Sequence, residues 1–482
     1  MIYDSVIIGA GPAGLAFANY AKKHNPNEKI IIIEKDNVIG GCHKVNRKKH
    51  NDEFYFCEHG PRVYIGNYVN FISLLKSMKL DFKELFGKKY SIFSVLFKSV
   101  FQDKMLGFFD FLSFTRDFIL VLFDNKHGIN ISMYDYMVFN NFSKEAMINI
   151  DFLCSSIDGG NSKMISLNNF INTTIQTFLY SIYIPKKPND EALFNYWHQY
   201  LHKEKKVDFL LNSPVAEISF FDNNKNKLES VILKDGRSIK GKRFIFAIPP
   251  INQYKIKGLK EAFELKEDYV EKTEYLESIT LTLHWDYELN LENDLNVFNT
   301  KTEWFLIADN MTEIMKFKER KSKTVISCAI VLTNVKGRYI DKTANECSEE
   351  ELFEEVYQQL RLIYKNIPRP TLIFNNNYFD TKKNEWHANE CAFVKIPNYD
   401  YLDFNSKKVK NIYSLGTHNG KQKNSFTSLE SAISNSIKLS NIIFNKKDKI
   451  KRCFDLRDLT IVIISIILLL LIIRYTYSNY DK

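Results

Sequence analysis

Glycine, proline and closely spaced cysteines are scarce in this sequence. Its 482 residues include 18 glycines and 11 prolines, too few for a collagen-like or low-complexity chain. The seven cysteines are scattered without a Cys-x-x-Cys pair, which argues against a structural zinc site and predicts no metal centre. An odd number of dispersed cysteines is typical of reduced thiols in a cytosol-like compartment.

The overall composition is that of a large globular protein. Hydrophobic residues make up 45% and charged residues 26% of the chain, which argues against intrinsic disorder, and the length favours two domains or one elaborated domain. The net charge is +9, but the lysines are spread along the whole chain, so no nucleic-acid partner is expected. The opening MIYDSVIIGAGPAG has no basic region before its apolar stretch, so we predict no secretory signal peptide.

The first residues predict one strand–helix–strand unit. Residues 2–8 are an apolar run typical of a buried strand, and Pro12–His24 is an alanine-rich stretch typical of a helix. The run KIIIIE at residues 29–34 predicts a second buried strand of the parallel type.

The turn between the first strand and the helix carries the pattern Gly9-x-Gly11-x-x-Gly14. Gly9 permits a tight turn, Gly11 lets a pyrophosphate approach the backbone, and Gly14 lets the helix pack closely on the strand. The free N–H groups at the start of the helix, where Pro12 and Ala13 stand, favour phosphate binding. The pattern predicts a dinucleotide site.

An acid and a second glycine pair complete this predicted site. Glu34 lies twenty residues after Gly14, where a carboxylate accepts hydrogen bonds from a ribose diol, and this disfavours NADP. Gly40 and Gly41 let the chain pass close to a ligand. From the residues alone the site suits FAD or NAD, and the neighbours Lys35 and Cys42 are further candidates for contact with the cofactor.

Segments along most of the chain resemble the flavin amine oxidase superfamily. The stretch from Val6 to Gly41 resembles its N-terminal FAD signature, and FCEHGPRVY at residues 56–64 resembles its segment ending in Gly-Pro, which passes near the flavin. The superfamily includes monoamine and polyamine oxidases, protoporphyrinogen oxidase, phytoene-desaturase-type enzymes and UDP-galactopyranose mutase. The resemblance implies FAD as the cofactor.

Two later segments extend the resemblance. The stretch around Val215, up to AIPP at residues 247–250, resembles the second FAD segment, in which the residue matching Val215 contacts the adenine side. Gly416 and Thr417, followed by a helix predicted over residues 427–444 with Ser428 and Leu429 near its start, resemble the C-terminal flavin-binding segment. Many members have Asp where Thr417 stands, and Arg is common in place of Cys42 and His43, so contacts to the ribityl chain and pyrophosphate are expected to differ.

Catalytic residues are difficult to read from the sequence, because the flavin itself accepts the hydride. Arg62 follows the Gly-Pro segment and is a candidate for a position near the flavin. His284, beside Trp285 at a predicted strand end, is a second candidate, with a hydrogen-bonded core histidine as the alternative. Cys391 loosely resembles the position of the flavin-linked cysteine of monoamine oxidases, with a buried free thiol as the alternative.

The Phe-rich stretch 91–123 is strongly apolar but contains charged residues. We therefore expect packed helices of a substrate region rather than a membrane span, with partial membrane dipping as the alternative. The interrupting residues are Lys98, Asp103, Lys104, Asp110, Arg116 and Asp117.

The C-terminal residues predict a membrane anchor. Residues 459–473 are almost wholly apolar, with Arg474, Tyr475 and Tyr477 placed to lie at the interface. The preceding KKDKIKR at 446–452 is basic, which predicts a single-pass protein whose body faces the cytosol and a linker that attracts anionic lipid. Cys453 is a candidate palmitoylation site.

The predicted fold is α/β: a Rossmann-type FAD-binding domain with an inserted α+β substrate domain and a C-terminal transmembrane helix. The FAD domain is expected in three pieces with the substrate regions between them. The predicted boundaries are 1–80, 206–255 and 401–445 for FAD binding, 81–205 for a mostly helical cap, 256–400 for a sheet and helix, 446–458 for the basic linker and 459–475 for the anchor.

The expected function is that of a membrane-anchored FAD-dependent oxidoreductase. It would move a hydride from a C–N or C–C bond of a small-molecule substrate, with an apolar or lipid-borne one suggested by the Phe-rich region, and O₂ would reoxidise the flavin. One alternative is a flavin isomerase resembling UDP-galactopyranose mutase. Another is a non-enzymatic binding protein resembling the GDP-dissociation inhibitors.

Overall fold

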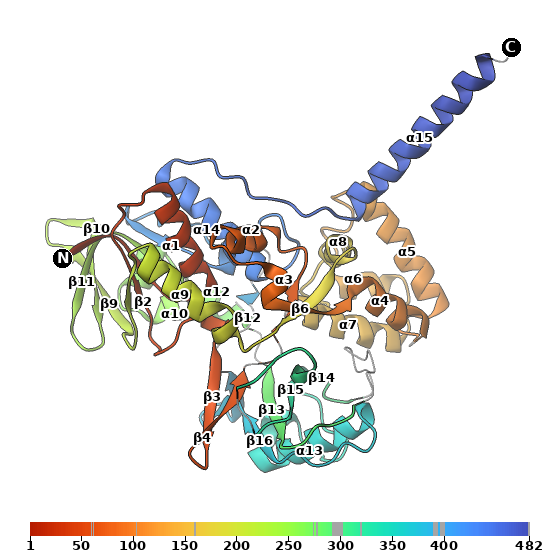
Figure 1. Ribbon diagram of the computed structural model, residues 1–482, viewed down its shortest axis with the longest axis horizontal. Helices are drawn as coiled ribbons and strands as arrows, with labels where there is room; N and C mark the ends of the chain where they lie inside the picture. The colour runs from red at the N-terminus through yellow and green to blue at the C-terminus, as the bar shows by residue number, and fades with distance from the viewer. Residues whose placement is uncertain are drawn as a thin grey trace.

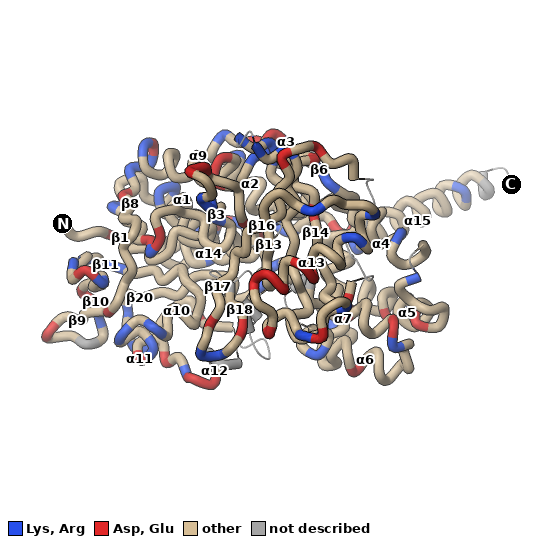
Figure 2. The backbone as a smooth tube through the Cα atoms, turned by 90° about the horizontal axis from the view of Figure 1, so that it is seen from below, with Lys and Arg blue, Asp and Glu red and all other residues tan. Residues whose placement is uncertain are grey.

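A computed structural model of the chain describes residues 1–58, 60, 62–102, 104–158, 161–272, 274–275, 278–291, 302–318, 321–388, 394–395 and 401–480. One sheet lies at one end of the body and a group of helices at the other, with a second sheet below and between them, and one long helix projects away (Figure 1). Basic and acidic residues are interspersed over the face drawn in Figure 2, which agrees with the diffuse charge of the sequence.

A seven-stranded sheet, counted over the described residues, has the order β8-β2-β1-β11-β10-β9, with β20 also paired to β11. Strand β1 runs parallel to β2 and β11, and β20 runs parallel to β11, whereas β9, β10 and β11 form an antiparallel meander. The bounds are β1 Ile2–Ile8, β2 Ile30–Ile33, β8 Asp208–Leu210, β9 Val215–Phe221, β10 Asn224–Leu233, β11 Ser238–Phe246 and β20 Ile412–Ser414.

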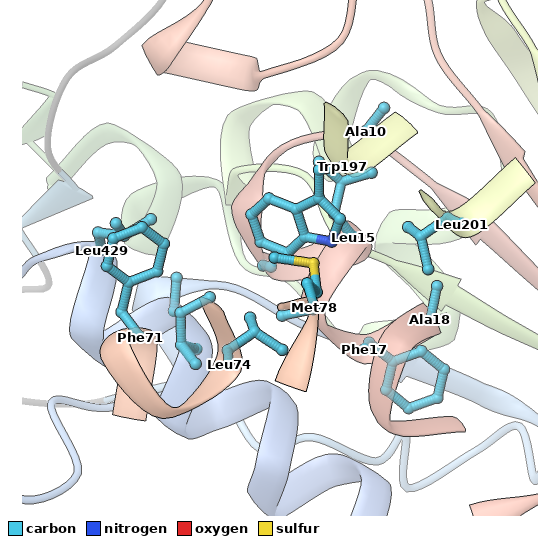
Figure 3. Close-up of a cluster of buried hydrophobic side chains, with 14 of the residues drawn as sticks. Ala10, Leu15, Phe17, Ala18, Phe71, Leu74, Met78, Trp197, Leu201 and Leu429 are labelled. Atoms are coloured by element: carbon cyan, nitrogen blue, oxygen red, sulfur yellow. The ribbon is translucent and has the colours of Figure 1, made fainter. Parts of the chain in front are cut away.

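Helices cover both faces of this sheet, which explains why its first strands are apolar without alternation. On one face α1 (Pro12–His24) packs against α14 (Leu429–Phe444), and α2 (Val69–Ser77) joins them in a common core. Figure 3 shows Leu15 of α1 and Met78, just after α2, beside Trp197, and Leu429 of α14 beside Phe71 of α2. On the other face α10 (Pro250–Lys255) and α11 (Leu259–Phe263) cover a second core.

A four-stranded antiparallel sheet of order β14-β15-β13-β16 forms a separate core with α13 (Glu349–Ile363). Ser348 and Glu351 form the capping box at the start of α13. The Glu351 carboxylate accepts from the backbone N–H of Ser348 at 2.8 Å, and the Ser348 Oγ accepts from the backbone N–H of Glu351 at 3.3 Å. The strands near this core are β13 Ile279–Trp285, β14 Leu306–Asn310, β15 Thr324–Ile330, β16 Leu372–Asn375, β17 Asn377–Asp380, β18 Glu385–Ala388, β3 Val45–His50 and β4 Glu53–Glu58.

The helical group contains five helices in the part of the chain that the structure describes, and four of them, α5 to α8, surround an apolar cluster of their own. Within the segment 81–205, predicted as a mostly helical cap, Phe86–Ser91 forms strand β6 because it pairs with β7 (Ser181–Pro185). Strand β5 (Tyr64–Ile65) pairs with the other side of β7. The helices are α4 Ile92–Phe97, continued as a π-helix to Gln102, α5 Phe108–Phe123, α6 Met133–Phe139, α7 Lys144–Asp158 and α8 Leu167–Thr177.

The chain ends in the projecting helix α15 (Leu456–Tyr480). Its stretch Leu456–Tyr477 is, within the described residues, the one helix long and apolar enough to cross a membrane. The segment between α14 and α15 runs along the outside of the body from the sheet end to the helical group (Figure 1). There the Nη2 of Arg457 donates to the carbonyl oxygen of Val121 in α5 at 2.9 Å.

Candidate functional site

A cavity of about 1020 Å³ lies where the carboxyl ends of the parallel strands meet the starts of α1 and α14. This edge of a parallel sheet is the usual location of a ligand site in open α/β folds, because helix N-termini converge there. Segments far apart in the sequence contribute to the wall. They include the β1–α1 turn, the end of β2, the Gly41–His43 turn, the start of β9, the end of β11 and the Gly416–His418 loop.

The glycine turn after β1 forms a narrow cradle at one end of the cavity. Gly9 has φ +105°, and a Cβ there would lie 2.5 Å from the carbonyl oxygen of Ala247. Gly11 and Gly41 face each other across the cradle, since a Cβ on Gly41 would lie 3.0 Å from the Cα of Gly11. Within the described residues no side chain caps α1 at Gly11, so its first N–H groups suit an anion.

Glu34 lies at the end of β2, beside this cradle. Its Oε2 accepts a hydrogen bond from the backbone N–H of Ala10 at 2.8 Å, and its Oε1 accepts one from Asp36 at 3.2 Å. These two bonds fix the carboxylate in the cavity wall, where its side chain is buried. A carboxylate has roughly four acceptor positions, so the geometry suits additional donors such as ribose hydroxyls.

The start of α14 and the Gly416–His418 loop form the opposite wall. Ser428 caps α14, because its Oγ accepts from the N–H of Ser431 at 3.3 Å. Asn435, one turn further on, donates from its Nδ2 to the carbonyl oxygen of Gly416 at 2.7 Å and so ties the loop to the helix. The neighbouring His418 is buried, and this burial lowers the pKa of its imidazole to about 3.

The structure brings almost all of the sequence-predicted cofactor residues to this one cavity. Gly14 is the exception: a Cβ there would lie 2.2 Å from the carbonyl oxygen of Gly9, so its role is close packing of α1 on β1. The predicted residues that line the cavity are Gly9, Gly11, Pro12, Ala13, Glu34, Lys35, Gly41, Cys42, Val215, Gly416, Thr417, Ser428 and Leu429.

The three catalytic candidates have different positions. Arg62 lines the cavity. His284 is not among the lining residues; it is buried in β13, with Nδ1 2.8 Å from the Oγ of Ser322 and Nε2 2.9 Å from the carbonyl oxygen of Phe56. Cys391 lies outside the described residues.

Arg62 belongs to a buried polar group that the sequence did not indicate. The guanidinium is 9% exposed, and its Nε and Nη2 have no hydrogen-bond partner among the described residues. Burial raises the pKa of Glu58 to about 8, although the charge of Arg62 acts in the opposite direction. Burial, and to a lesser degree Arg62, lowers the pKa of His43 to about 3. At pH 7 Glu58 is therefore largely protonated and His43 is neutral.

The cavity continues from the cradle into the helical group. This apolar arm is walled by α4, its π-helical continuation, α5, α7 and α8. Its lining is dominated by aliphatic and aromatic side chains, and the threonines of α8 are its main polar component. The Phe-rich composition of residues 91–123 indicated apolar packing but not which side chains face a cavity. The arm includes Val95, Leu96, Val100, Leu106, Phe111, Phe114, Phe118, Ile150, Leu153, Phe170 and Phe178.

One family model matches most of the chain, and solved structures share its fold. The family model described as flavin containing amine oxidoreductase matches residues 12–434. UDP-galactopyranose mutase of Mycoplasma genitalium is 37% identical over 76 residues, which are 15% of this chain and 18% of the mutase. The match therefore spans less than a fifth of that relative.

Solved structures cover much more of the chain at lower identity. Putrescine oxidase with bound putrescine is 14% identical, with a TM-score of 0.62, over 92% of this chain and 100% of that chain. An oxidoreductase from Methanosarcina mazei is 13% identical, with a TM-score of 0.60, over 90% of this chain and 99% of that chain. At these identities the likeness shows the fold alone.

Proposed function

The chain belongs to the family of flavin-containing amine oxidoreductases, and from this premise we propose that it is a membrane-anchored FAD-dependent oxidoreductase acting on a substrate with a large apolar part. The observation that carries the proposal is the continuity of one cavity from the glycine cradle into the apolar arm. The Rossmann-type part would hold the dinucleotide, and the helical group with the second sheet would hold the substrate.

The residues of the cradle fit FAD. A Cβ on Gly11 would extend into the space that a pyrophosphate needs, and the uncapped start of α1 supplies N–H groups to it. Glu34 would accept hydrogen bonds from the ribose, and Val215 would contact the adenine side. The unpartnered Nε and Nη2 of Arg62 suit an oxygen or nitrogen acceptor of the flavin or the substrate.

The bound flavin supplies the hydride acceptor, and the protein supplies orientation and a dry environment. The N-terminus of α14 would place partial positive charge near the flavin, where reduction increases negative charge. Neutral His43 and protonated Glu58 offer hydrogen bonds without adding charge beside Arg62. The apolar arm would hold the hydrocarbon part of the substrate and exclude water, leaving a C–N or C–C bond at the flavin.

We further propose that α15 anchors the body to a membrane from the cytosolic side. The apolar length of Leu456–Tyr477 and the basic residues before it support this orientation. Part of the linker's charge is used within the protein, since Arg452 pairs with Asp455 at 3.0 Å and also with Asp458. The remaining lysines between 446 and 451 would face anionic lipid.

The experiment that tests this proposal begins with the full chain purified in detergent. A flavin absorption spectrum is expected, and anaerobic addition of amines, porphyrinogens and polyprenoids should identify a class that bleaches it; admission of O₂ should restore the colour. Protein that contains no flavin and takes up none on refolding with FAD would contradict the proposal and favour a non-enzymatic binding protein.

A second candidate function is a flavin isomerase, favoured by the 76-residue match to UDP-galactopyranose mutase. The apolar arm argues against it, because a nucleotide sugar needs several cationic and polar partners. Activity on UDP-galactopyranose that appears only after chemical reduction of the flavin, with no net oxidation, would establish this alternative.

A further inference from the structure

Helix α5 is apolar on two sides. Phe111, Phe114 and Phe118 line the cavity. On other faces of the same helix, Phe108 is 71%, Phe109 79% and Phe123 68% exposed to solvent. A helix that is apolar nearly all round belongs in a protein core or in a membrane, and in the described part of the chain nothing covers these outer phenylalanines.

The same two-sided pattern continues through α4 and the π-helix. Val95, Leu96 and Val100 line the cavity, whereas Phe93, Phe97 and Phe101 are about half exposed. The ring centroids of these three phenylalanines follow one another at 6.0 and 4.9 Å, so they form a continuous aromatic row on the surface. Together with the outer side chains of α5 they make a larger apolar patch than scattered surface residues would give.

The two acidic residues of α5 do not interrupt the patch. Asp110 and Asp117 are 6% and 4% exposed, because both turn inward. The carboxylate of Asp110 accepts from the N–H of Gly107 at 3.1 Å and from the Oγ of Ser143 at 2.8 Å. Asp117 accepts from the hydroxyl of Tyr136 at 3.0 Å and lies 2.7 Å from the Nε2 of His127. The two carboxylates of α5 are thus internal, and the exposed Lys104 and Arg116 beside the patch are basic.

The patch lies beside the root of the proposed anchor. Arg457, in the first turn of α15, donates to the carbonyl oxygen of Val121 in α5 at 2.9 Å and also to the amide oxygen of Asn172 in α8. Leu456 packs against the apolar cluster of the helical group. Figure 1 shows α15 leaving the body next to α5 and α8. A bilayer that takes up α15 must therefore pass close to α5.

We propose that the outer face of α4 and α5 is a second membrane contact, immersed in the leaflet that receives the start of α15. We call it the docking face and define it by Phe93, Phe97, Phe101, Phe108, Phe109 and Phe123. Its occupant is the lipid bilayer, and the exposed Lys104 at its margin suits a lipid phosphate, whereas the neighbouring Arg116 pairs with Asp117. The inference rests on the proposed anchoring and adds a route by which an apolar substrate passes from the leaflet into the cavity arm behind the same helices.

The test measures depth in the bilayer at chosen residues of the full chain. A bimane label is attached to Phe109→Cys on the docking face, to Phe108→Cys as a second site there, to Ile467→Cys in α15, and to Phe54→Cys as the matched control. Phe54 is a 57% exposed phenylalanine on the β3–β4 hairpin, far from α15 in Figure 1. The described native cysteines are buried or half-buried, and unsubstituted protein labelled in parallel gives the background.

Each labelled protein is reconstituted into phosphatidylcholine vesicles with a minority of phosphatidylserine, with and without nitroxide-labelled lipid. We expect the nitroxide to remove most of the fluorescence at positions 108, 109 and 467 and little at position 54. Quenching at 467 without quenching at 108 or 109 would overturn the docking face and leave the anchor intact. No quenching at 467 would contradict the anchoring itself. Blue-shifted emission at 109 without lipid quenching would show that protein covers this face.

Discussion

The glycine cradle and the apolar arm share one cavity but hold a ligand by different means. The cradle brings backbone atoms within contact distance, as at Gly11 and Gly41, and uses two helix N-termini and one fixed carboxylate. The arm uses the bulk of aliphatic and aromatic side chains from several helices. A site made of backbone tolerates almost no substitution, whereas an apolar wall can be built from many sequences. The cradle is therefore specified residue by residue, and the apolar arm is specified only by shape.

The largest effect is expected from Gly14→Ala, which disrupts the close packing of α1 on β1 beneath the cradle. Its Cβ would lie 2.2 Å from the carbonyl oxygen of Gly9 and 3.2 Å from a methyl group of Ile7. Moving the backbone of the turn or of β1 to make room would be costly, so we expect the free energy of unfolding to fall by about 3 kcal/mol. Thermal unfolding of the full chain without FAD measures it, and an unchanged melting temperature would contradict this view of the turn.

Gly11→Ala is the matched variant that separates binding from folding. A Cβ here meets the Cα of Gly41 at 3.6 Å, an ordinary contact, so the melting temperature without FAD should change little. The added methyl group enters the proposed pyrophosphate space, and FAD affinity should fall by about tenfold or more, which corresponds to roughly 1.4 kcal/mol. Titration of the flavin-free protein with FAD gives the affinity. Normal affinity would mean that the pyrophosphate lies elsewhere.

A substitution in the arm should leave the cofactor end intact. Leu96→Trp fills part of the arm from α4, and we expect reduction of bound flavin by long apolar substrates to slow by about tenfold, the scale of a hydrophobic pocket misfit. Phe97→Trp, at the next residue but on the outer side, is the control and should leave the rate unchanged. Stopped-flow reduction under anaerobic conditions makes the comparison. Equal rates of flavin reduction in the two variants would show that the substrate does not occupy the arm.

The smallest effect concerns Glu58, whose carboxyl has a pKa raised by burial from 4.5 to about 8. The folded state then holds this proton more tightly than the unfolded state. The free energy of unfolding is greatest below about pH 4.5 and decreases as the pH rises through about 8. Glu58→Gln mimics the protonated form and should remove this decrease, so the variant should be more stable than wild type at pH 8. Chemical unfolding of wild type and variant across this pH range measures the difference, with the exposed Glu53→Gln as control. Parallel curves of unfolding free energy against pH for wild type and Glu58→Gln would contradict the raised pKa of Glu58.

Much of the cofactor end could be predicted because its chemistry is local. The strand 2–8 and the helix Pro12–His24 agree with Ile2–Ile8 and Pro12–His24, and the helix expected from 427 begins at Leu429. The predicted strand 29–34 is slightly shorter, at Ile30–Ile33. Glycine spacing and uninterrupted apolar runs determine these elements within a few residues of sequence.

The rest depended on contacts between distant segments. Strand β6 exists because β7, about a hundred residues later, pairs with it. In the sequence, Asp110 and Asp117 look like interruptions of an apolar surface. Only the fold shows that Ser143, Tyr136 and His127 bond these carboxylates inside the protein. The two sides of α5 are likewise indistinguishable in a run of phenylalanines, since both are apolar. The polar group of Glu58, His43 and Arg62 carries no signature in its spacing.

The pairing of β1, β11 and β20 also has a consequence for biosynthesis. Phe246 pairs with Ile8 on one side and with Ser414 on the other, so about 400 residues separate the outer strands of this trio. At roughly 5–20 residues per second, a ribosome needs about 20–80 s to make them. One edge of β1 stays unpaired until β11 (Ser238–Phe246) is made, and β11 in turn waits for β20 until the end of this interval. Cofactor loading is accordingly a late event, completed only after Leu429–Phe444 has emerged, with the apolar helix α15 following next in the nascent chain.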